Sequence, residues 1–160
     1  FLKEGQEFVE EKSPLRYDRA GNIQRLALRD SSIEPPYRGD FGFADQYSYR
    51  NPRTGRMGKK RHMEAPGAGD DIVGFLDYHS QGETSDGKPY LYIDYMKTRR
   101  EHKQQGVATK LLDEFIKRFA PGPGSVIHFG KVQNPDMWSL YEKTKKKYPD
   151  HQIMGAKNFA

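Results

Sequence analysis

The stretch that decides the fold runs from Tyr90 to Leu112 and reads YLYIDYMKTRREHKQQGVATKLL. Its first part, Tyr90–Met96, is built from β-branched and aromatic residues and predicts a strand. After Gly106, apolar residues recur at helical spacing as far as Phe119 and predict an amphipathic helix. The N-terminus of a helix offers backbone N–H groups to an anion. From the residues alone, this turn is either a phosphate cradle or an ordinary strand–helix connection with solvated Lys and Arg.

The segments around this stretch predict one sheet with strands in both directions. The helix ends at the Pro121–Gly124 turn, and Val126–Val132 follows as a strand. A strand–helix–strand unit forms a right-handed crossover, so this strand is expected to run parallel to residues 90–96. Three strands joined by turn-like connections indicate an antiparallel meander, formed by Ala44–Tyr49, Ile72–Tyr78 and Tyr90–Met96.

The rest of the chain gives less regular patterns. Residues 1–70 are rich in turn signals; Phe8–Glu10 predicts a short strand, and Ile23–Leu28 is ambiguous between helix and strand. Asn134 followed by Pro135 predicts the start of a second helix, with Asn134 as the N-cap. We expect a single domain over residues 1–160, of the α/β (α+β) class, with a single mixed, mostly antiparallel sheet flanked by helices.

The composition excludes several kinds of protein and site. The chain has 160 residues, no cysteine and a formal net charge of +5. Without cysteine there are no disulfide scaffolds, thiol nucleophiles or Cys-ligated metals, and the five histidines lack metal-ligand spacing, so we expect no metal. No apolar run approaches the roughly 18 residues of a membrane span, and the first twenty residues lack the apolar segment of a secretion signal. We expect a cytoplasmic protein without a membrane partner; it begins with Phe1, as a fragment or a processed chain would.

Residues 103–108 (KQQGVA) resemble the acetyl-CoA signature of the GNAT superfamily of N-acetyltransferases. In that signature, Arg or Gln precedes two residues, a Gly, one residue, and a Gly or Ala. Lys103 departs from it at the first position, and Gln104 stands where a second glycine is often found. Residues 134–143 resemble the family's next strand–helix unit, in which an Asn and a Tyr flank the cofactor. The resemblance spans residues 72–146, the expected acetyl-CoA-binding unit behind a loop-rich front half.

The resemblance implies an acyl-CoA N-acyltransferase fold and transfer of an acetyl group from acetyl-CoA to a primary amine by direct attack. It implies that the strands 90–96 and 126–132 separate to admit the pantetheine arm. Backbone groups near the end of the first strand would hold the acetyl carbonyl. The cofactor-binding positions that it implies are Met96, Lys97, Thr98, Lys103, Gln104, Gln105, Gly106, Val107, Ala108, Asn134 and Tyr141.

The resemblance also implies two catalytic roles. Tyr141 matches the helix tyrosine that gives a proton to the leaving thiolate, although its spacing with Met137 and Trp138 also suits a core aromatic. Asp94 is the candidate base for the amine, with Glu101 and Asp77 as fallbacks; water alone, or a structural role for Asp94, are the alternatives. Alternation places Asp94 on one face with Tyr92 and Met96, opposite Leu91, Ile93 and Tyr95.

A basic stretch from Arg50 to Arg61 holds six Lys or Arg in twelve residues and no acid. It is either a solvated hairpin loop or a contact for an anionic partner, such as RNA or an acidic protein. The second interpretation supports an alternative function, a GNAT-like binding module without catalysis. The acceptor amine and the choice between monomer and homodimer stay open, because the resemblance places the acceptor side in the front half and a C-terminal hairpin.

Overall fold

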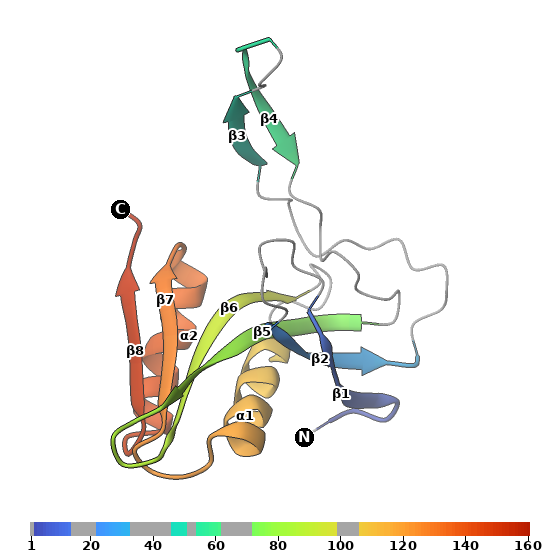
Figure 1. Ribbon diagram of the computed structural model, residues 1–160. Coiled ribbons are helices and arrows are strands. Elements are labelled where there is room, and N and C mark those ends of the chain that lie inside the picture. The colour runs from blue at the N-terminus through green and yellow to red at the C-terminus, as the bar shows by residue number, and fades with distance from the viewer. Residues whose placement is uncertain (1, 14–21, 33–45, 51–53, 62–71, 99–105) are drawn as a thin grey trace.

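The computed structural model describes residues 2–13, 22–32, 46–50, 54–61, 72–98 and 106–160. Its main feature is a six-stranded sheet with two helices packed on one face (Figure 1). The helices are α1 (Val107–Phe119) and α2 (Pro135–Lys147). The strands are, in spatial order, β1 (Gln6–Lys12), β2 (Gln24–Asp30), β5 (Ile72–Glu83), β6 (Pro89–Thr98), β7 (Val126–Val132) and β8 (Gln152–Lys157).

The strand directions confirm a mixed, mostly antiparallel sheet. The first four strands in the spatial order are antiparallel to their neighbours, whereas β6 and β7 are parallel and so are β7 and β8. Each parallel pair is joined by a helix, as a crossover requires. After β7, α2 carries the chain back and β8 enters the sheet parallel to β7.

The predicted meander is also corrected at one strand. β3 (Gln46–Arg50) pairs with β4 (Met57–Arg61) in a separate two-stranded sheet, and not with β5. The place beside β5 belongs to β2, which settles the ambiguous segment Ile23–Leu28 as a strand. Leu26, Ala27 and Leu28 are consecutive and fully buried, so this strand needs cover on both faces. A strand with that pattern belongs in the interior of a sheet.

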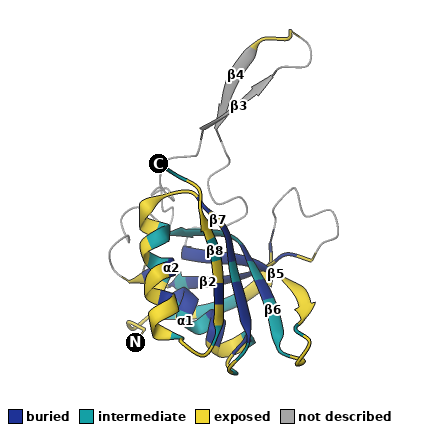
Figure 2. Ribbon diagram, turned by 90° about the vertical axis from the view of Figure 1, so that its left-hand side faces the viewer, coloured by how far each residue is buried: buried dark blue, intermediate teal, exposed yellow. Residues whose placement is uncertain are grey.

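The hydrophobic core has two parts, one on each face of the sheet. Figure 2 shows the buried residues along the strands of the sheet. The larger part lies between the sheet and the helices, where Leu111 and Phe115 of α1 pack against Leu26 and Leu76. The face opposite the helices is called the far face below. It carries a smaller cluster made by Ala27, Ile72 and Phe75, with Val9 and Tyr95 packed against it.

A buried ion pair joins β2 to β5 on the far face. Arg25 donates from Nε to Asp77 Oδ1 at 2.7 Å and from a terminal nitrogen to Oδ2 at 3.0 Å, and both side chains are 0% exposed. Ser13 donates a third hydrogen bond to Oδ2, and the guanidinium lies 3.8 Å from the ring centre of Phe75. Burial raises the pKa of Asp77 above its ordinary value, although Arg25 and Ser13 act in the opposite direction.

Within the described ranges, no helix is long and apolar enough to cross a membrane.

Candidate active site

β6 and β7 are paired only over their first residues. Tyr90–Tyr92 pair with Val126–His128, and the pairing stops there, although both strands are described to their ends at Thr98 and Val132. Figure 1 shows the two strands diverging beyond this point. Beyond Tyr92 and His128 the facing edges of the two strands are not paired with each other, and such edges are groups to which an extended ligand can add. We call this region the opening.

Both strands are irregular where the opening begins. In β6, Asp94 is an extra residue, because its neighbours Ile93 and Tyr95 pair with consecutive residues of β5. In β7, the register with β8 shifts after His128, and Gly130 has a φ of 67°. A bulge bends a strand and increases its twist. We attribute the divergence of β6 from β7 to these irregularities.

The bulge corrects the predicted alternation along β6. The sequence placed Asp94 and Met96 on one face and Tyr95 on the other. In the structure, Met96 packs with Ile93 in the core beneath the helices, and Tyr95 packs into the cluster on the far face. The extra residue shifts every later side chain by one position, so a single bulge reverses the prediction beyond it.

Asp94 holds an imidazole from the neighbouring strand. Its Oδ2 lies 2.7 Å from Nδ1 of His79, on β5. The side chain of Asp94 is 9% exposed and that of His79 is 24% exposed. The other ring nitrogen, Nε2, lies 2.7 Å from the side-chain nitrogen of Gln81, an exposed residue. A partly exposed carboxylate–imidazole pair therefore lies where the opening begins.

Three rings form a row across the sheet beside this pair. His79, Tyr92 and His128 are register partners on β5, β6 and β7. Their ring centres are 5.2 Å apart for His79 and Tyr92, and 5.1 Å apart for Tyr92 and His128. A Cβ added at Gly130 would overlap the hydroxyl of Tyr92, so glycine at this position leaves room for the phenol. The row restrains the plane of the His79 imidazole.

The first turn of α1 lies next to the end of β6. A Cβ added at Gly74, on β5, would lie 2.7 Å from Val107 Cγ1 and 3.2 Å from the carbonyl oxygen of Lys97. The helix begins after Gly106, which has a φ of 75°, and among the described residues no side chain caps it. Since α2 is capped by Asn134, the two helix starts differ: no described side chain binds the first backbone N–H groups of α1, which are groups that an anion can bind.

The comparisons with known proteins identify the family of the chain. The model of the Acetyltransferase (GNAT) family matches residues 25–145, which is more than half of the chain. The chain belongs to the GNAT acetyltransferase family. A search of curated proteins finds no match.

Among solved structures, the chain is similar to a ribosomal-protein-alanine N-acetyltransferase from Brucella melitensis biovar Abortus 2308, with 11% sequence identity and a TM-score of 0.32. The similarity covers 90% of this chain and 55% of that one, so this GNAT chain spans little more than half the length of its neighbour.

Several predicted GNAT positions lie along the opening and at the start of α1. Met96, Lys97 and Thr98 are the last residues of β6, beyond the bulge, and all three are half-buried. Gly106 is the N-cap of α1, and Val107 and Ala108 are its first residues. Lys103, Gln104 and Gln105 lie outside the described residues.

Asn134 and Tyr141 belong to α2. The side chain of Asn134 accepts a hydrogen bond from the backbone N–H of Met137 at 2.9 Å, which confirms the predicted cap. Tyr141 is 6% exposed, its ring packs against Trp138, and its hydroxyl donates to the carbonyl of Ile153 at 3.5 Å. These contacts place the Tyr141 hydroxyl beneath β8.

The structure does not bring the two predicted catalytic residues together. Tyr141 packs in the core on the helix side of the sheet, whereas Asp94 contacts His79 and shares the far face with it. Any group that meets both must reach through the opening between β6 and β7. The two fallback carboxylates differ: Asp77 is fully buried and bound by Arg25, and Glu101 lies outside the described residues.

Sequence reasoning missed His79, which it considered only as one of five histidines without metal-ligand spacing. The signal was present in the predicted hairpin, because two antiparallel strands joined by the turn at residues 82–88 bring His79 opposite Tyr92. Pairing His79 with Asp94 required the bulge as well, and the residues around position 94 contain no glycine or other marker of one.

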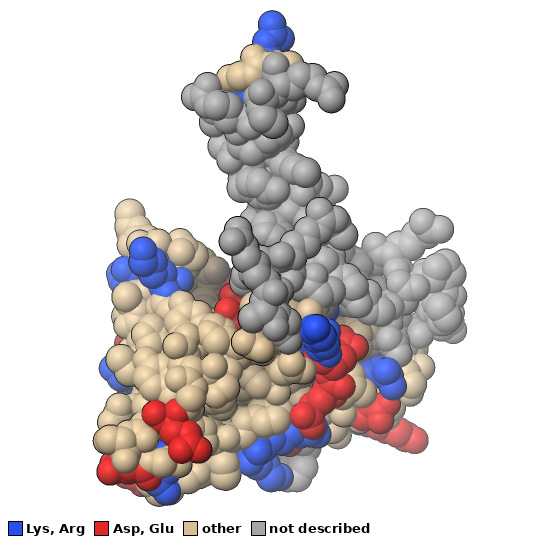
Figure 3. All heavy atoms as spheres, in the orientation of Figure 1, with Lys and Arg blue, Asp and Glu red and all other residues tan. Residues whose placement is uncertain are grey.

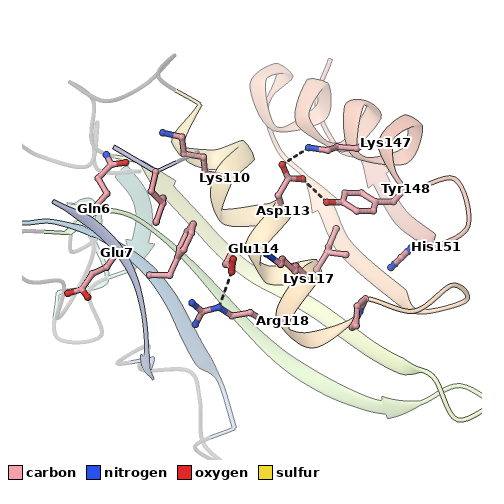
Figure 4. A pocket seen from close by; sticks show the side chains of 14 residues that line it. Gln6, Glu7, Lys110, Asp113, Glu114, Lys117, Arg118, Lys147, Tyr148 and His151 are labelled. Carbon is pink, nitrogen blue, oxygen red and sulfur yellow. Dashed lines mark hydrogen bonds and ion pairs between the residues drawn. The ribbon is translucent and has the colours of Figure 1, made fainter. Parts of the chain in front are cut away.

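A groove on α1 is a second feature of the surface. Its volume is about 920 Å³, and β1, α1 and the end of α2 line it (Figure 4). Some of its polar groups bind one another: Asp113 contacts Lys147 and Tyr148, and Arg118 contacts Glu114. Burial raises the pKa of Tyr148, and the hydrogen bond to Asp113 adds to the effect. No residue of β6 or β7 is among the described residues that line it, so the groove is separate from the opening.

The basic stretch is part of a hairpin. Arg50, the last residue of β3, pairs with Met57, the first residue of β4, and the stretch ends with β4 at Arg61. Thr54, Gly55 and Arg56 lie at its exposed turn, and in Figure 1 the hairpin is set apart from the six-stranded sheet. Figure 3 shows acidic and basic side chains interspersed over the body of the molecule in that view. The proposed anionic partner stays a prediction.

Proposed function

We propose that this chain is an N-acetyltransferase that moves an acetyl group from acetyl-CoA to a primary amine by direct attack. The observation that carries the proposal is the opening between β6 and β7, which extends from the bulge at Asp94 toward the first turn of α1 in a chain of the GNAT family. We further propose that residues 1–160 act as one cytoplasmic domain, as a monomer or a homodimer.

The described residues suit the chemistry of acetyl-CoA, which supplies an activated thioester when bound. The backbone N–H groups of Val107 and Ala108 would bind the pyrophosphate, because no described side chain caps the start of α1 and its first turn contains no acid. The edge of β6 at residues 96–98 would bind the pantetheine arm and the acetyl carbonyl through backbone groups. Lys103, Gln104 and Gln105 would complete this contact, and Asn134 would add another.

Tyr141 is proposed as the acid that protonates the leaving thiolate. Phenols keep their proton at neutral pH, so a phenol can donate it to the sulfur as the carbon–sulfur bond breaks. The long contact of its hydroxyl with Ile153 would be exchanged for one with the sulfur. Tyr141→Phe keeps the ring packing and should lower kcat by roughly 10²–10⁴ with unchanged acetyl-CoA affinity. Unchanged turnover would remove Tyr141 from the mechanism.

The acceptor amine would approach from the far face, where Asp94 is the candidate base for its proton. Thermal unfolding with acetyl-CoA tests the proposal without knowledge of the acceptor. Ligand at a hundred times its dissociation constant stabilises a protein by about 2.7 kcal/mol. CoA release with polyamines, amino acids, aminoglycosides, peptides and aminoacyl-tRNA then identifies the acceptor class. The absence of any shift at saturating acetyl-CoA would contradict the proposal.

The alternative is a GNAT-like module that binds an anionic partner without catalysis. The observation that favours it is the basic hairpin, which forms its own two-stranded sheet. Binding of a generic RNA should then weaken steeply with salt, and neutralising four basic residues should abolish it: Arg53, Arg56, Lys59 and Lys60. Binding that does not respond to salt would argue against this alternative.

A further inference from the structure

We propose that His79 is the group that accepts the proton of the acceptor amine, and that Asp94 is the residue that positions it. The inference rests on the proposed function and changes the assignment of the base within it. It follows from the hydrogen bonds of His79, from the rings packed beside it and from its place relative to the opening.

The hydrogen bonds fix which ring nitrogen of His79 can take a proton. An ionised carboxylate only accepts hydrogen bonds, so Nδ1, at 2.7 Å from Asp94, carries the hydrogen. The side-chain nitrogen of Gln81 is a donor, so Nε2, at 2.7 Å from it, is the acceptor. In this arrangement the lone pair of the imidazole is on Nε2. A carboxylate on one ring nitrogen and an available lone pair on the other is the arrangement that general bases of the Asp–His type use.

The exposure of the pair favours His79 over Asp94 as the proton acceptor. The Asp94 side chain is 9% exposed and one of its oxygens is bound to the imidazole, whereas His79 is 24% exposed. The group on Nε2 belongs to Gln81, whose exposed side chain an incoming amine can displace. The carboxylate therefore supports the imidazole, and the imidazole meets the substrate.

His79 also lies at the right place in the sheet. It is the register partner of Tyr92, the last residue of β6 that pairs with β7. The groups that face it are Asp94 and Tyr92 from β6, and the row continues to His128 on β7. Asp77, two residues away on β5, is fully engaged by Arg25. Asp94 is thus the carboxylate in contact with this imidazole.

The proton transfers balance with His79 in this role. The amine nitrogen forms a bond to the acetyl carbonyl carbon, and its N–H proton passes to Nε2 of His79. The bond between that carbon and the sulfur breaks, and the thiolate takes a proton from the proposed acid, Tyr141. The products are the N-acetyl amine and CoA, and the imidazolium and the phenolate return to their starting forms through solvent.

The first test is the tautomer of His79, which is independent of activity. Long-range ¹⁵N–¹H correlation spectra of the protein distinguish a hydrogen on Nδ1 from one on Nε2, and His79→Gln identifies the resonances. We expect the hydrogen on Nδ1 in the wild type and a loss of this preference in Asp94→Asn. A hydrogen on Nε2 in the wild type would overturn the proposal.

The second test is kinetic and uses acetyl-CoA with whichever of spermidine, lysine, an aminoglycoside or an amino-terminal peptide releases CoA. His79→Gln should lower kcat/KM for the amine by roughly 10²–10⁴ and leave acetyl-CoA affinity unchanged. The pH profile of kcat/KM should change in His79→Gln, because the group that accepts the proton is gone, and imidazole added to His79→Ala should restore part of the rate. Because His79 and Asp94 act as a unit, the double variant with Asp94→Asn should lose little more than His79→Gln alone.

His151→Gln is the matched control, because this half-buried histidine contacts the carbonyl of Ala120 and lies outside the opening. If His79→Gln retains the rate and the pH profile while the wild type is active, the assignment of the base is wrong and the acetyltransferase proposal stands. If the wild type neither binds acetyl-CoA nor releases CoA with any of these amines, the proposed function fails and this inference fails with it.

Discussion

Two carboxylates on the far face of the sheet each hold a basic side chain, and their surroundings differ. Asp77 accepts two hydrogen bonds from Arg25 and one from Ser13, and the ion pair is fully buried. Asp94 holds His79 through one hydrogen bond, and both side chains keep some exposure. The first pair joins two strands within the ladder, and the second lies where the ladder between β6 and β7 stops.

This difference in burial distinguishes a pair that stabilises the fold from a pair that can take part in proton transfer. A fully buried pair cannot exchange protons with a ligand without losing its partner, and removing one member leaves a buried charge. A partly exposed pair at an opening can exchange protons, and its loss costs little stability. Substitutions in the Arg25 pair should therefore act mainly on folding, and substitutions in the His79 pair mainly on turnover.

The largest effect on stability is expected for Arg25→Met. This change leaves the Asp77 carboxylate buried without its cation and should lower the free energy of unfolding by about 3–5 kcal/mol. Urea unfolding monitored by circular dichroism measures it. Replacing both residues, as Arg25→Met with Asp77→Leu, should recover much of the loss, because buried pairs are often replaceable by apolar groups. If the double variant is as unstable as Arg25→Met alone, this account of the pair is contradicted.

The loss in Arg25→Met should also depend on pH. Burial already raises the pKa of Asp77, and removing Arg25 takes away a group that lowers it. The folded variant then binds a proton at Asp77 more readily than the unfolded chain does, so this group favours folding in acid and loses that contribution as the pH rises through its raised pKa. Relative to wild type, the variant should be less destabilised in mild acid than at neutral pH. Equal destabilisation at both pH values would contradict the proposed protonation of Asp77 in the variant.

Gly130→Ala should have an intermediate effect. A Cβ there overlaps the hydroxyl of Tyr92, and the φ of 67° is unfavourable for other residues. We expect a loss of about 1–3 kcal/mol, together with displacement of the ring row and slower turnover. Gly87→Ala is the matched control, with a φ of 77° and nothing within 4 Å of an added Cβ. Equal losses in both variants would mean that backbone strain alone explains the effect.

The smallest effect on stability is expected for His79→Gln. One partly exposed hydrogen bond to Asp94 changes, which corresponds to about 1 kcal/mol or less. The same variant should show the large kinetic defect described above. A defect in folding as large as that of Arg25→Met would show that the second pair is structural as well, and would erase the distinction between them.

The elements that the sequence predicted best are those with strong local patterns. Residues 107–119 form α1 and residues 126–132 form β7, with the predicted limits, because helical periodicity and the Pro121–Gly124 turn act over short distances. Asn134 likewise marks the start of α2, because its side chain accepts a hydrogen bond from the backbone N–H of Met137. These features depend on neighbours in the sequence.

The features that the sequence did not predict depend on register between distant strands. Alternation along β6 failed beyond Asp94, because one extra residue reverses the faces and leaves no composition signal. β2 lies beside β5 although more than forty residues separate them, and only the burial of Leu26, Ala27 and Leu28 on both faces explains that position. The contact of His79 with Asp94 depends on both the hairpin register and the bulge. The role that we propose for His79 could therefore be inferred from the structure and not from the sequence.

Hydrogen exchange with and without acetyl-CoA tests the central claim most directly, namely that the opening between β6 and β7 is the acetyl-CoA site. Mass spectrometry of the native protein resolves the backbone amides of residues 94–98 and of the first turn of α1. The account predicts that acetyl-CoA slows exchange in these two segments and leaves the strand around Arg25 and the groove lined by β1 unchanged. Protection confined to the groove, or no protection at saturating acetyl-CoA, would contradict it.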